Sequence, residues 1–230
     1  MKTKRKKLRL RVVFIFLLVI LLIVGIIYSV IHIPTKRIIV KGNVYTKESD
    51  IIIASGYSDY PYLFSVSDDD IRKEIKKYPF IDDVNINKTL FGELKITVTE
   101  GHPLFYNRNN SKLVLSSNKE IDSDNLYGVP SLINFVPDTL YERLISEFGN
   151  IDQNVINLIN EIEYQPWKNE DAMIDETRFL LRMNDGNQIY INLIHMQKLN
   201  NYIEIFASLE DKKGILYLDS SSDKISFSVY

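Results

Sequence analysis

The chain opens on a long apolar stretch without any periodic polar position. Residues 12–31 read VVFIFLLVILLIVGIIYSVI, with no charged side chain and Ser29 as the one plainly polar residue. A helix of about 20 residues crosses a hydrocarbon core about 30 Å thick. A helix buried in a soluble core would instead carry a polar stripe along one side. The pattern therefore predicts a transmembrane helix.

Charge on either side of this stretch predicts its orientation. Seven Lys and Arg and no acidic residue lie in residues 1–11, whereas few basic residues follow the stretch closely. Basic residues beside a span stay cytoplasmic. We therefore expect a single-pass protein of the plasma membrane, with a cytoplasmic tail (1–11), an anchor (12–33) and the remainder outside. A cleaved signal peptide is the alternative, but its apolar core is about 7–15 residues long and ends at small residues, which YSVIHIP does not provide.

Behind the anchor, short patterns predict the order β-α-α-β-β. A β-branched strand ends at Gly42-Asn43, and a helix with Thr46 as its N-cap ends at Gly56. A second helix begins at Ser67, which has capping-box spacing to Asp70, and stops before Pro79. Two strands follow, at 84–88 and 94–100, with alternating apolar and polar residues. We expect a three-stranded sheet covered on one face by two helices.

Residues 104–230 predict a second mixed domain with a mainly antiparallel sheet. A strand at 112–116 and a turn at Ser117-Asn118 are followed by a helix that opens at Pro137 and stops at Gly149. A further helix is expected from about Asp152 to Ile162, since apolar residues recur there at helical spacing. The fold class is thus α+β, in two extracytoplasmic domains (34–103 and 104–230).

The clearest local signal is a β-hairpin around Asp185-Gly186. Strands at 179–183 and 189–193 flank it, and Asp-Gly favours a type I′ turn, which requires positive φ. A long helix with Leu199, Tyr202, Ile203, Phe206 and Leu209 is expected next. Two strands, at 214–219 and 225–230, close the pattern.

Composition limits the chemistry. The chain has 28 Lys and Arg, seven of them in the tail, against 30 Asp and Glu, so the extracytoplasmic part is acidic and a poor surface for nucleic acid. It has no cysteine, which excludes disulfides, thiolate metal sites and cysteine nucleophiles. The three histidines have no metal-site spacing, and no nucleotide-binding or hydrolase motif is present. We predict a non-enzyme without cofactor, metal or small-molecule substrate.

The order of these sequence segments resembles that in the FtsQ/DivIB family of bacterial division proteins. In the first domain, which resembles a POTRA domain, the matching residues are Gly42-Asn43, Tyr62-Leu63-Phe64, Pro79-Phe80-Ile81 and Val98-Thr99-Glu100 with Pro103 beyond. In the second, which is similar to the family's β domain, they are 182–186 and 213–219. The hairpin turn 89–92 departs from the pattern, since the family often has proline there. The resemblance covers nearly all of the chain.

The resemblance implies a partner-binding role. In the family, the last strands of the β domain engage the single-span proteins FtsB/DivIC and FtsL, at the division septum. An exposed strand edge can accept a partner's strand through backbone hydrogen bonds, and residues 225–230 alternate as a strand does. The alternative is that they form an interior strand. The candidate contact residues are Tyr217, Ile225, Phe227, Val229 and Tyr230.

Two other functions fit an anchored protein of this size. A membrane-anchored cell-wall enzyme would need a cleft of convergent titratable groups. A POTRA-type export chaperone would bind unfolded strands promiscuously, but such proteins usually carry several POTRA units or a barrel.

Overall fold

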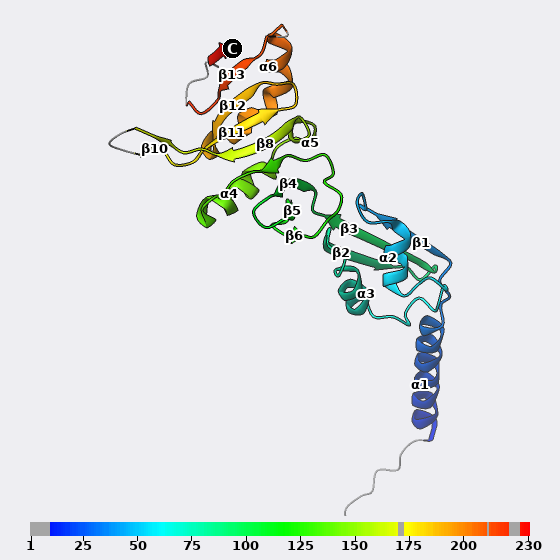
Figure 1. The fold of residues 1–230 in the computed structure, drawn as a ribbon. Coiled ribbons are helices and arrows are strands. Elements are labelled where there is room, and N and C mark those ends of the chain that lie inside the picture. The colour runs from blue at the N-terminus through cyan, green and yellow to red at the C-terminus, as the bar shows by residue number, and fades with distance from the viewer. Residues whose placement is uncertain (1–9, 170–172, 211, 221–225) are drawn as a thin grey trace, which may run out of the picture. The chain divides into compact units, whose positions relative to one another are not determined.

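The computed structural model describes residues 10–169, 173–210, 212–220 and 226–230. It divides into two compact units, Met1–Glu100 and Gly101–Tyr230. The predicted span forms helix α1 (Leu10–Ile31) (Figure 1). Most of the side chains from Val12 to Ile31 are exposed. Among the described residues, Val12–Ile31 is the one helix long and apolar enough to cross a membrane. Its Ser29 hydroxyl donates to Gly25 O at 2.9 Å, so this polar group is satisfied inside the helix.

The rest of the first unit has the predicted order β-α-α-β-β. Its elements are β1 (Arg37–Lys41), α2 (Glu48–Ser55), α3 (Asp68–Ile75), β2 (Ile81–Lys88) and β3 (Glu93–Glu100). The sheet order is β1-β3-β2, with β1 parallel and β2 antiparallel to the central β3. The two helices contact each other, and their Ile51, Ile71 and Ile75 are fully buried in one cluster with Leu94 and Ile96 of β3.

Of the two predicted helix N-caps, one is confirmed and one is wrong. At α3, Ser67 is the N-cap, and its Oγ accepts from Asp70 N at 3.1 Å, as predicted. At α2, Thr46 is not the N-cap, because the chain enters the helix one residue later, at Lys47. The Glu100 carboxylate binds the backbone N–H groups of Val44, Tyr45 and Thr46 at 2.6–2.9 Å. This contact holds Thr46 in the preceding turn.

The second unit is built on a nine-stranded mixed sheet within the described residues. The strand order is β14-β13-β12-β11-β8-β7-β4-β5-β6, and most neighbours are antiparallel, with parallel pairs at β12–β13, β7–β8 and β4–β7. The strands are β4 (Pro103–Asn107), β5 (Lys112–Leu115), β6 (Glu120–Ile121), β7 (Ser131–Leu132), β8 (Ile159–Tyr164), β11 (Arg178–Met183), β12 (Gln188–Asn192), β13 (Gly214–Tyr217) and β14 (Ser226–Val229). The expected α+β class is confirmed.

The remaining elements of this unit are helices and one small hairpin. They are α4 (Asp138–Phe148), α5 (Gln153–Ile156), the 3₁₀ helix η1 (Leu193–Asn201), α6 (Tyr202–Ser208), and the hairpin of β9 (Trp167–Lys168) and β10 (Met173–Asp175). Phe148 of α4 packs edge-on against Phe105 of β4, with ring centroids 6.1 Å apart. The helix predicted between Pro137 and Gly149 is thus present, and its Leu140, Leu144, Ile145 and Phe148 are buried.

Two predictions for this unit are wrong in detail. The helix expected from Asp152 to Ile162 ends at Ile156, and Ile159 and Ile162 reach the core from strand β8 instead. Pairing of β8 with β11 and β7 decides this conformation. The hairpin at Asp185-Gly186 exists, but its turn is not type I′. Gly186 has positive φ (+94°) and Asp185 does not, which matches a three-residue loop with glycine in the left-handed position.

Candidate partner-binding edge

Strand β14 is the outermost strand of the second unit's sheet. It pairs antiparallel with β13, in the register Gly214↔Val229, Leu216↔Phe227 and Tyr217↔Ser226. Within the described residues, no strand pairs with its other side. We call that side the open edge.

The direction of backbone groups along β14 follows from one hydrogen bond. Tyr230 N donates to Lys213 O at 3.2 Å. Because hydrogen-bonding direction alternates along an antiparallel strand, Ser228 and Ser226 also face β13. The N–H and C=O groups of Phe227 and Val229 therefore point outward. The open edge offers two donors and two acceptors to an added strand.

The candidate side chains do not form one patch. Phe227 lies opposite the fully buried Leu216 and is half-buried, on the core face of the sheet. Val229 shares that face and is exposed. Tyr217 projects from the opposite face, where its ring stacks on Tyr190 with centroids 5.6 Å apart. Tyr230 follows β14 and is exposed, whereas Ile225 lies outside the described residues.

Gly214 contributes to the close packing of β13 against β14, and it was not predicted from the sequence. A Cβ at this position would lie 2.1 Å from Ser228 O and 2.9 Å from carbons of the Phe227 ring. Only glycine allows β13 and the Phe227 ring to approach so closely. The Lys213-Gly214 pair in the family-like segment 213–219 was the available signal.

A second overlooked residue, Asn187, ties β13 to the preceding hairpin. Its buried side chain accepts from Gly214 N at 3.0 Å and donates to the Tyr202 hydroxyl at 3.3 Å. Tyr202 in turn donates to Asp185 Oδ2 at 2.6 Å. Burial and this hydrogen bond raise the pKa of Tyr202 well above its ordinary value of 10.0. The hairpin turn thus supports the strand on which β14 rests.

The far end of β13 is fixed by a mostly buried ion pair. Arg178 Nε lies 2.8 Å from Asp219 Oδ2, and the guanidinium carbon is 3.7 Å from the centroid of the Tyr190 ring. Such stacking is attractive for arginine. The arrangement orders Tyr190 and, through it, Tyr217 beside the open edge.

The carboxylate of Asp175 in β10 has a lowered pKa. Burial acts to raise its pKa, but hydrogen bonds from Asn192 and Thr177 outweigh burial and hold the pKa below its ordinary value. Its partners are two side-chain groups and the backbone N–H of Thr177, at 2.8 Å each. The lowered pKa of Asp175 is therefore explained by hydrogen bonds that stabilise the local turn. Among the described residues, no three His, Asp or Glu gather as a metal site would require.

The comparisons with known proteins agree on one family. Residues 33–100 match the family model described as POTRA domain, FtsQ-type. The chain is 24% identical over 227 residues to the cell division protein DivIB of Listeria monocytogenes, which covers 95% of this chain and 82% of that protein. It is 22% identical over 197 residues to DivIB of Geobacillus kaustophilus, covering 82% and 74%. Residues 33–100 thus form a POTRA domain of the FtsQ type, and the chain is similar to DivIB division proteins along most of its length.

The extent of the match varies among FtsQ/DivIB relatives. With DivIB of Enterococcus faecalis the identity is 28% over 156 residues, covering 63% of this chain and 38% of that longer protein. A solved structure of the major extracytoplasmic domain of DivIB from Geobacillus stearothermophilus aligns with a TM-score of 0.38 and 18% identity, over 49% of this chain and 96% of that one. The resemblance predicted from the sequence is confirmed by the FtsQ-type POTRA match of residues 33–100 and by the DivIB relatives.

Proposed function

We propose that this protein is a non-catalytic, single-pass division protein that captures partner membrane proteins by strand addition at β14. Helix α1 crosses the plasma membrane with residues 1–11 in the cytoplasm, and both folded units lie outside, at the division septum. The partners are single-span proteins of the FtsB/DivIC and FtsL type. Three observations support this proposal: α1 is long and apolar enough to cross a membrane, the relatives are DivIB division proteins, and β14 has an open edge.

The observation that carries the mechanism is the chemistry of the open edge. Strand β14 reads Ser-Phe-Ser-Val, without charge, proline or bulge. Charged residues, proline and bulges are features that usually protect outermost strands from pairing with another chain. An extended segment of the partner would bond to the outward groups of Phe227 and Val229. The Phe227 and Val229 side chains would then contact its apolar residues.

Two further features of the chain favour capture. Bulky aromatic residues are enriched among those that dominate binding energy, and Phe227 and Tyr230 flank the edge. A shared membrane also confines chain and partner to one surface, which raises the effective concentration of the partner. A modest strand–strand interface is therefore sufficient for a stable complex.

The direct test replaces Phe227 in the full-length chain. Phe227→Asp places a charge on the core face beside Leu216, and we expect loss of capture of a co-expressed single-span partner of the FtsB/DivIC type, measured by co-purification from solubilised membranes. Ile203→Asp is the matched control, because Ile203 is an exposed apolar residue of α6 in the same unit. Circular dichroism checks that both variants fold. Unchanged capture by a folded Phe227→Asp protein would exclude this edge.

The non-catalytic part of the proposal has its own test. Turnover of peptidoglycan by the purified full-length protein would contradict it and favour the anchored cell-wall enzyme. We expect no turnover above that of a buffer control.

A further inference from the structure

The residues that follow helix α1 are hydrogen-bonded directly to two loops of the POTRA domain. Leu63 N donates to Ile33 O at 2.8 Å, and Thr35 Oγ1 donates to Pro61 O at 2.6 Å. Lys36 N donates to Gly92 O at 2.8 Å. The loop that contains 60–64 and the β2–β3 turn 89–92 are therefore both bound to the few residues that follow α1.

These two loops carry a cluster of exposed apolar and aromatic side chains. We call it the rim, and it consists of Tyr60, Tyr62, Phe64, Leu90 and Phe91. Phe91 is 86% exposed. Elsewhere in 33–100, the large hydrophobic residues exposed to a similar degree are Val44 and Ile53. Within residues 33–100, the exposed apolar side chains are thus concentrated in the two loops bound to the segment that follows α1.

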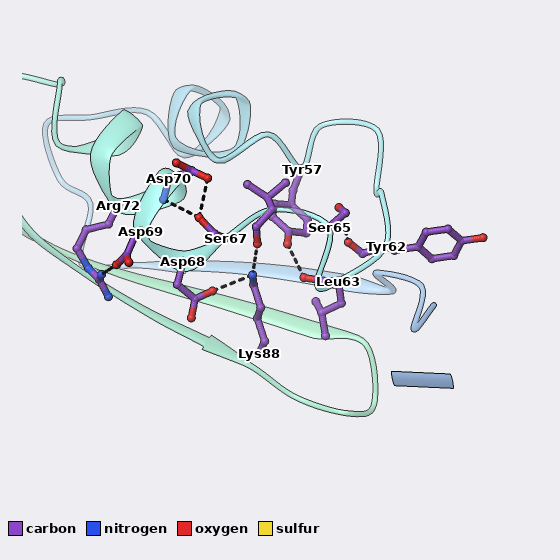
Figure 2. A network of polar contacts seen from close by, with 11 residues as sticks. Tyr57, Tyr62, Leu63, Ser65, Ser67, Asp68, Asp69, Asp70, Arg72 and Lys88 are labelled. Atoms are coloured by element: carbon purple, nitrogen blue, oxygen red, sulfur yellow. Dashed lines mark hydrogen bonds and ion pairs between the residues drawn. The ribbon is translucent and has the colours of Figure 1, made fainter. Parts of the chain in front are cut away.

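The rim is held firmly. Gly92 has φ +90°, and a Cβ there would lie 2.6 Å from Pro34 O, so the turn touches the exit segment directly. Lys88, just before that turn, reaches across to the other loop: its Nζ donates to Val66 O at 2.6 Å and lies 2.8 Å from Asp68 Oδ1 (Figure 2). Its side chain is only 6% exposed. The two loops are therefore fixed to each other.

Tyr62 of the rim lies close to the end of the proposed membrane span. A bilayer has a hydrocarbon core of about 30 Å inside a total of about 40–45 Å, which leaves about 5–8 Å of headgroup region on each side. Pro34, three residues beyond Ile31 and at most about 10 Å from it, bridges to Tyr62. The Tyr62 ring is 5.2 Å from that of His32, and in Figure 2 it points away from the sheet.

The composition of this region suits such a position. Tyrosine is enriched at the membrane–water interface, where its ring is in contact with apolar groups and its hydroxyl with water. Lys36 and Arg37 are exposed, and they closely follow Pro34, which pairs with Tyr62 of the rim. Their charges can meet the phosphates of lipid headgroups.

We propose that the rim inserts into the headgroup region of the outer leaflet and docks the POTRA domain on the bilayer. The occupant is the phospholipid interface itself. The inference rests on the proposed membrane span of α1 and extends it: the domain is held at a fixed height by contacts of its own, in addition to its covalent connection. Phe91 and Leu90 bury apolar surface among lipid, and Tyr62 lies at the interface.

Tryptophan fluorescence of the full-length chain tests this proposal. The chain has a single tryptophan, so Trp167→Phe gives a background without emission from tryptophan. Phe91→Trp then reports on the rim, and Val44→Trp is the matched control, because Val44 is 79% exposed in the same unit but follows the far end of β1. Leu21→Trp reports on the span. Each variant is reconstituted in phosphatidylethanolamine–phosphatidylglycerol vesicles, with or without lipids that carry a doxyl quencher. The doxyl group is placed near the headgroups for the Phe91→Trp and Val44→Trp proteins, and near the bilayer centre for the Leu21→Trp protein.

We expect the F91W protein to emit at shorter wavelength than the V44W protein and to lose most of its emission to the doxyl lipids, while V44W emission is unchanged. Equal, unquenched emission of F91W and V44W, with L21W quenched, would overturn the docking of the rim and leave the span intact. A blue shift of F91W without quenching would indicate a protein contact and would also overturn it. Failure of L21W to be quenched would refute the span, and both proposals with it.

Discussion

Strands β2 and β14 are both outermost strands, but only one of them is protected. Along β2, Asp83 pairs with Lys76 at 2.9 Å, Arg72 Nε donates to Val84 O at 3.2 Å, and the ladder is bulged between Ile81 and Asp83. The Lys76 ammonium holds the pKa of Asp83 below its ordinary value. Side chains thus occupy the backbone and surroundings of this edge.

On β14, by contrast, the outward backbone groups of Phe227 and Val229 face no described strand. An outermost position in a sheet therefore does not by itself leave backbone groups free for an added strand. Charge, bulges and neighbouring side chains decide whether an outermost strand can accept another chain. The comparison can be tested in each unit separately.

The largest expected effect is on the stability of the first unit. Glu100→Ala removes the carboxylate that accepts from three backbone N–H groups. Charge-assisted bonds of this kind contribute more than neutral ones, and we expect a loss of about 2–3 kcal/mol in the free energy of unfolding. Urea unfolding with amide exchange at Val44–Thr46 measures it.

Glu100→Gln keeps the side-chain shape and one acceptor, and should lose less stability. We expect partner capture at β14 to persist in both variants, because the open edge belongs to the second unit and Glu100 stabilises only the first. Loss of capture in the folded Glu100→Ala protein would contradict that independence.

A smaller effect is expected on binding at β14 itself. Val229→Pro removes a single N–H that faces outward, so it deletes a donor to the partner without breaking the ladder to β13. We expect about 10-fold weaker partner binding, which corresponds to about 1.4 kcal/mol, in a titration by surface plasmon resonance. Val229→Thr is the control and should bind within about twofold. Equal affinity of both variants would show that the outward N–H is not used.

The smallest effect concerns the support of β13 at high pH. The pKa of Tyr202 is raised in the folded protein, so the protonated phenol contributes stability that is fully present below pH 10 and is lost as the pH rises above it. Tyr202→Phe should lower the free energy of unfolding by about 1 kcal/mol at pH 7. The difference from the unsubstituted protein should shrink above pH 10. Denaturant titrations at pH 7 and above 10 measure both, and a pH-independent difference would contradict the assigned role of the hydroxyl.

Much of the first unit could be predicted from local patterns. Ser67 with Asp70 marked the start of α3, and the Gly42-Asn43 and Gly56 stops marked two element ends. These signals work because a cap or a turn depends on a few residues close in sequence. The Thr46 prediction failed because its neighbour Glu100 is 54 residues away.

The second unit resisted prediction where distant strands decide conformation. Residues 155–162 carry apolar side chains at a spacing that suits a helix, yet Ile159 and Ile162 form part of β8 because β11 and β7 supply partners on both sides. Short apolar runs fit either period. Strands β9 and β10 were not predicted from the sequence.

The sequence by itself determined the long apolar helix, the acidic and cysteine-free composition of the part that follows it, the order of the strands and helices in residues 37–100, and the resemblance to FtsQ/DivIB. Each depends on composition or on contacts between near neighbours along the chain. Only the tertiary structure decided that β14 is outermost, that Phe227 and Tyr217 occupy opposite faces, and that the rim adjoins the exit of α1. Strand order and loop proximity arise from pairing between segments far apart in sequence, and alternation within one strand cannot encode which strand lies beside it.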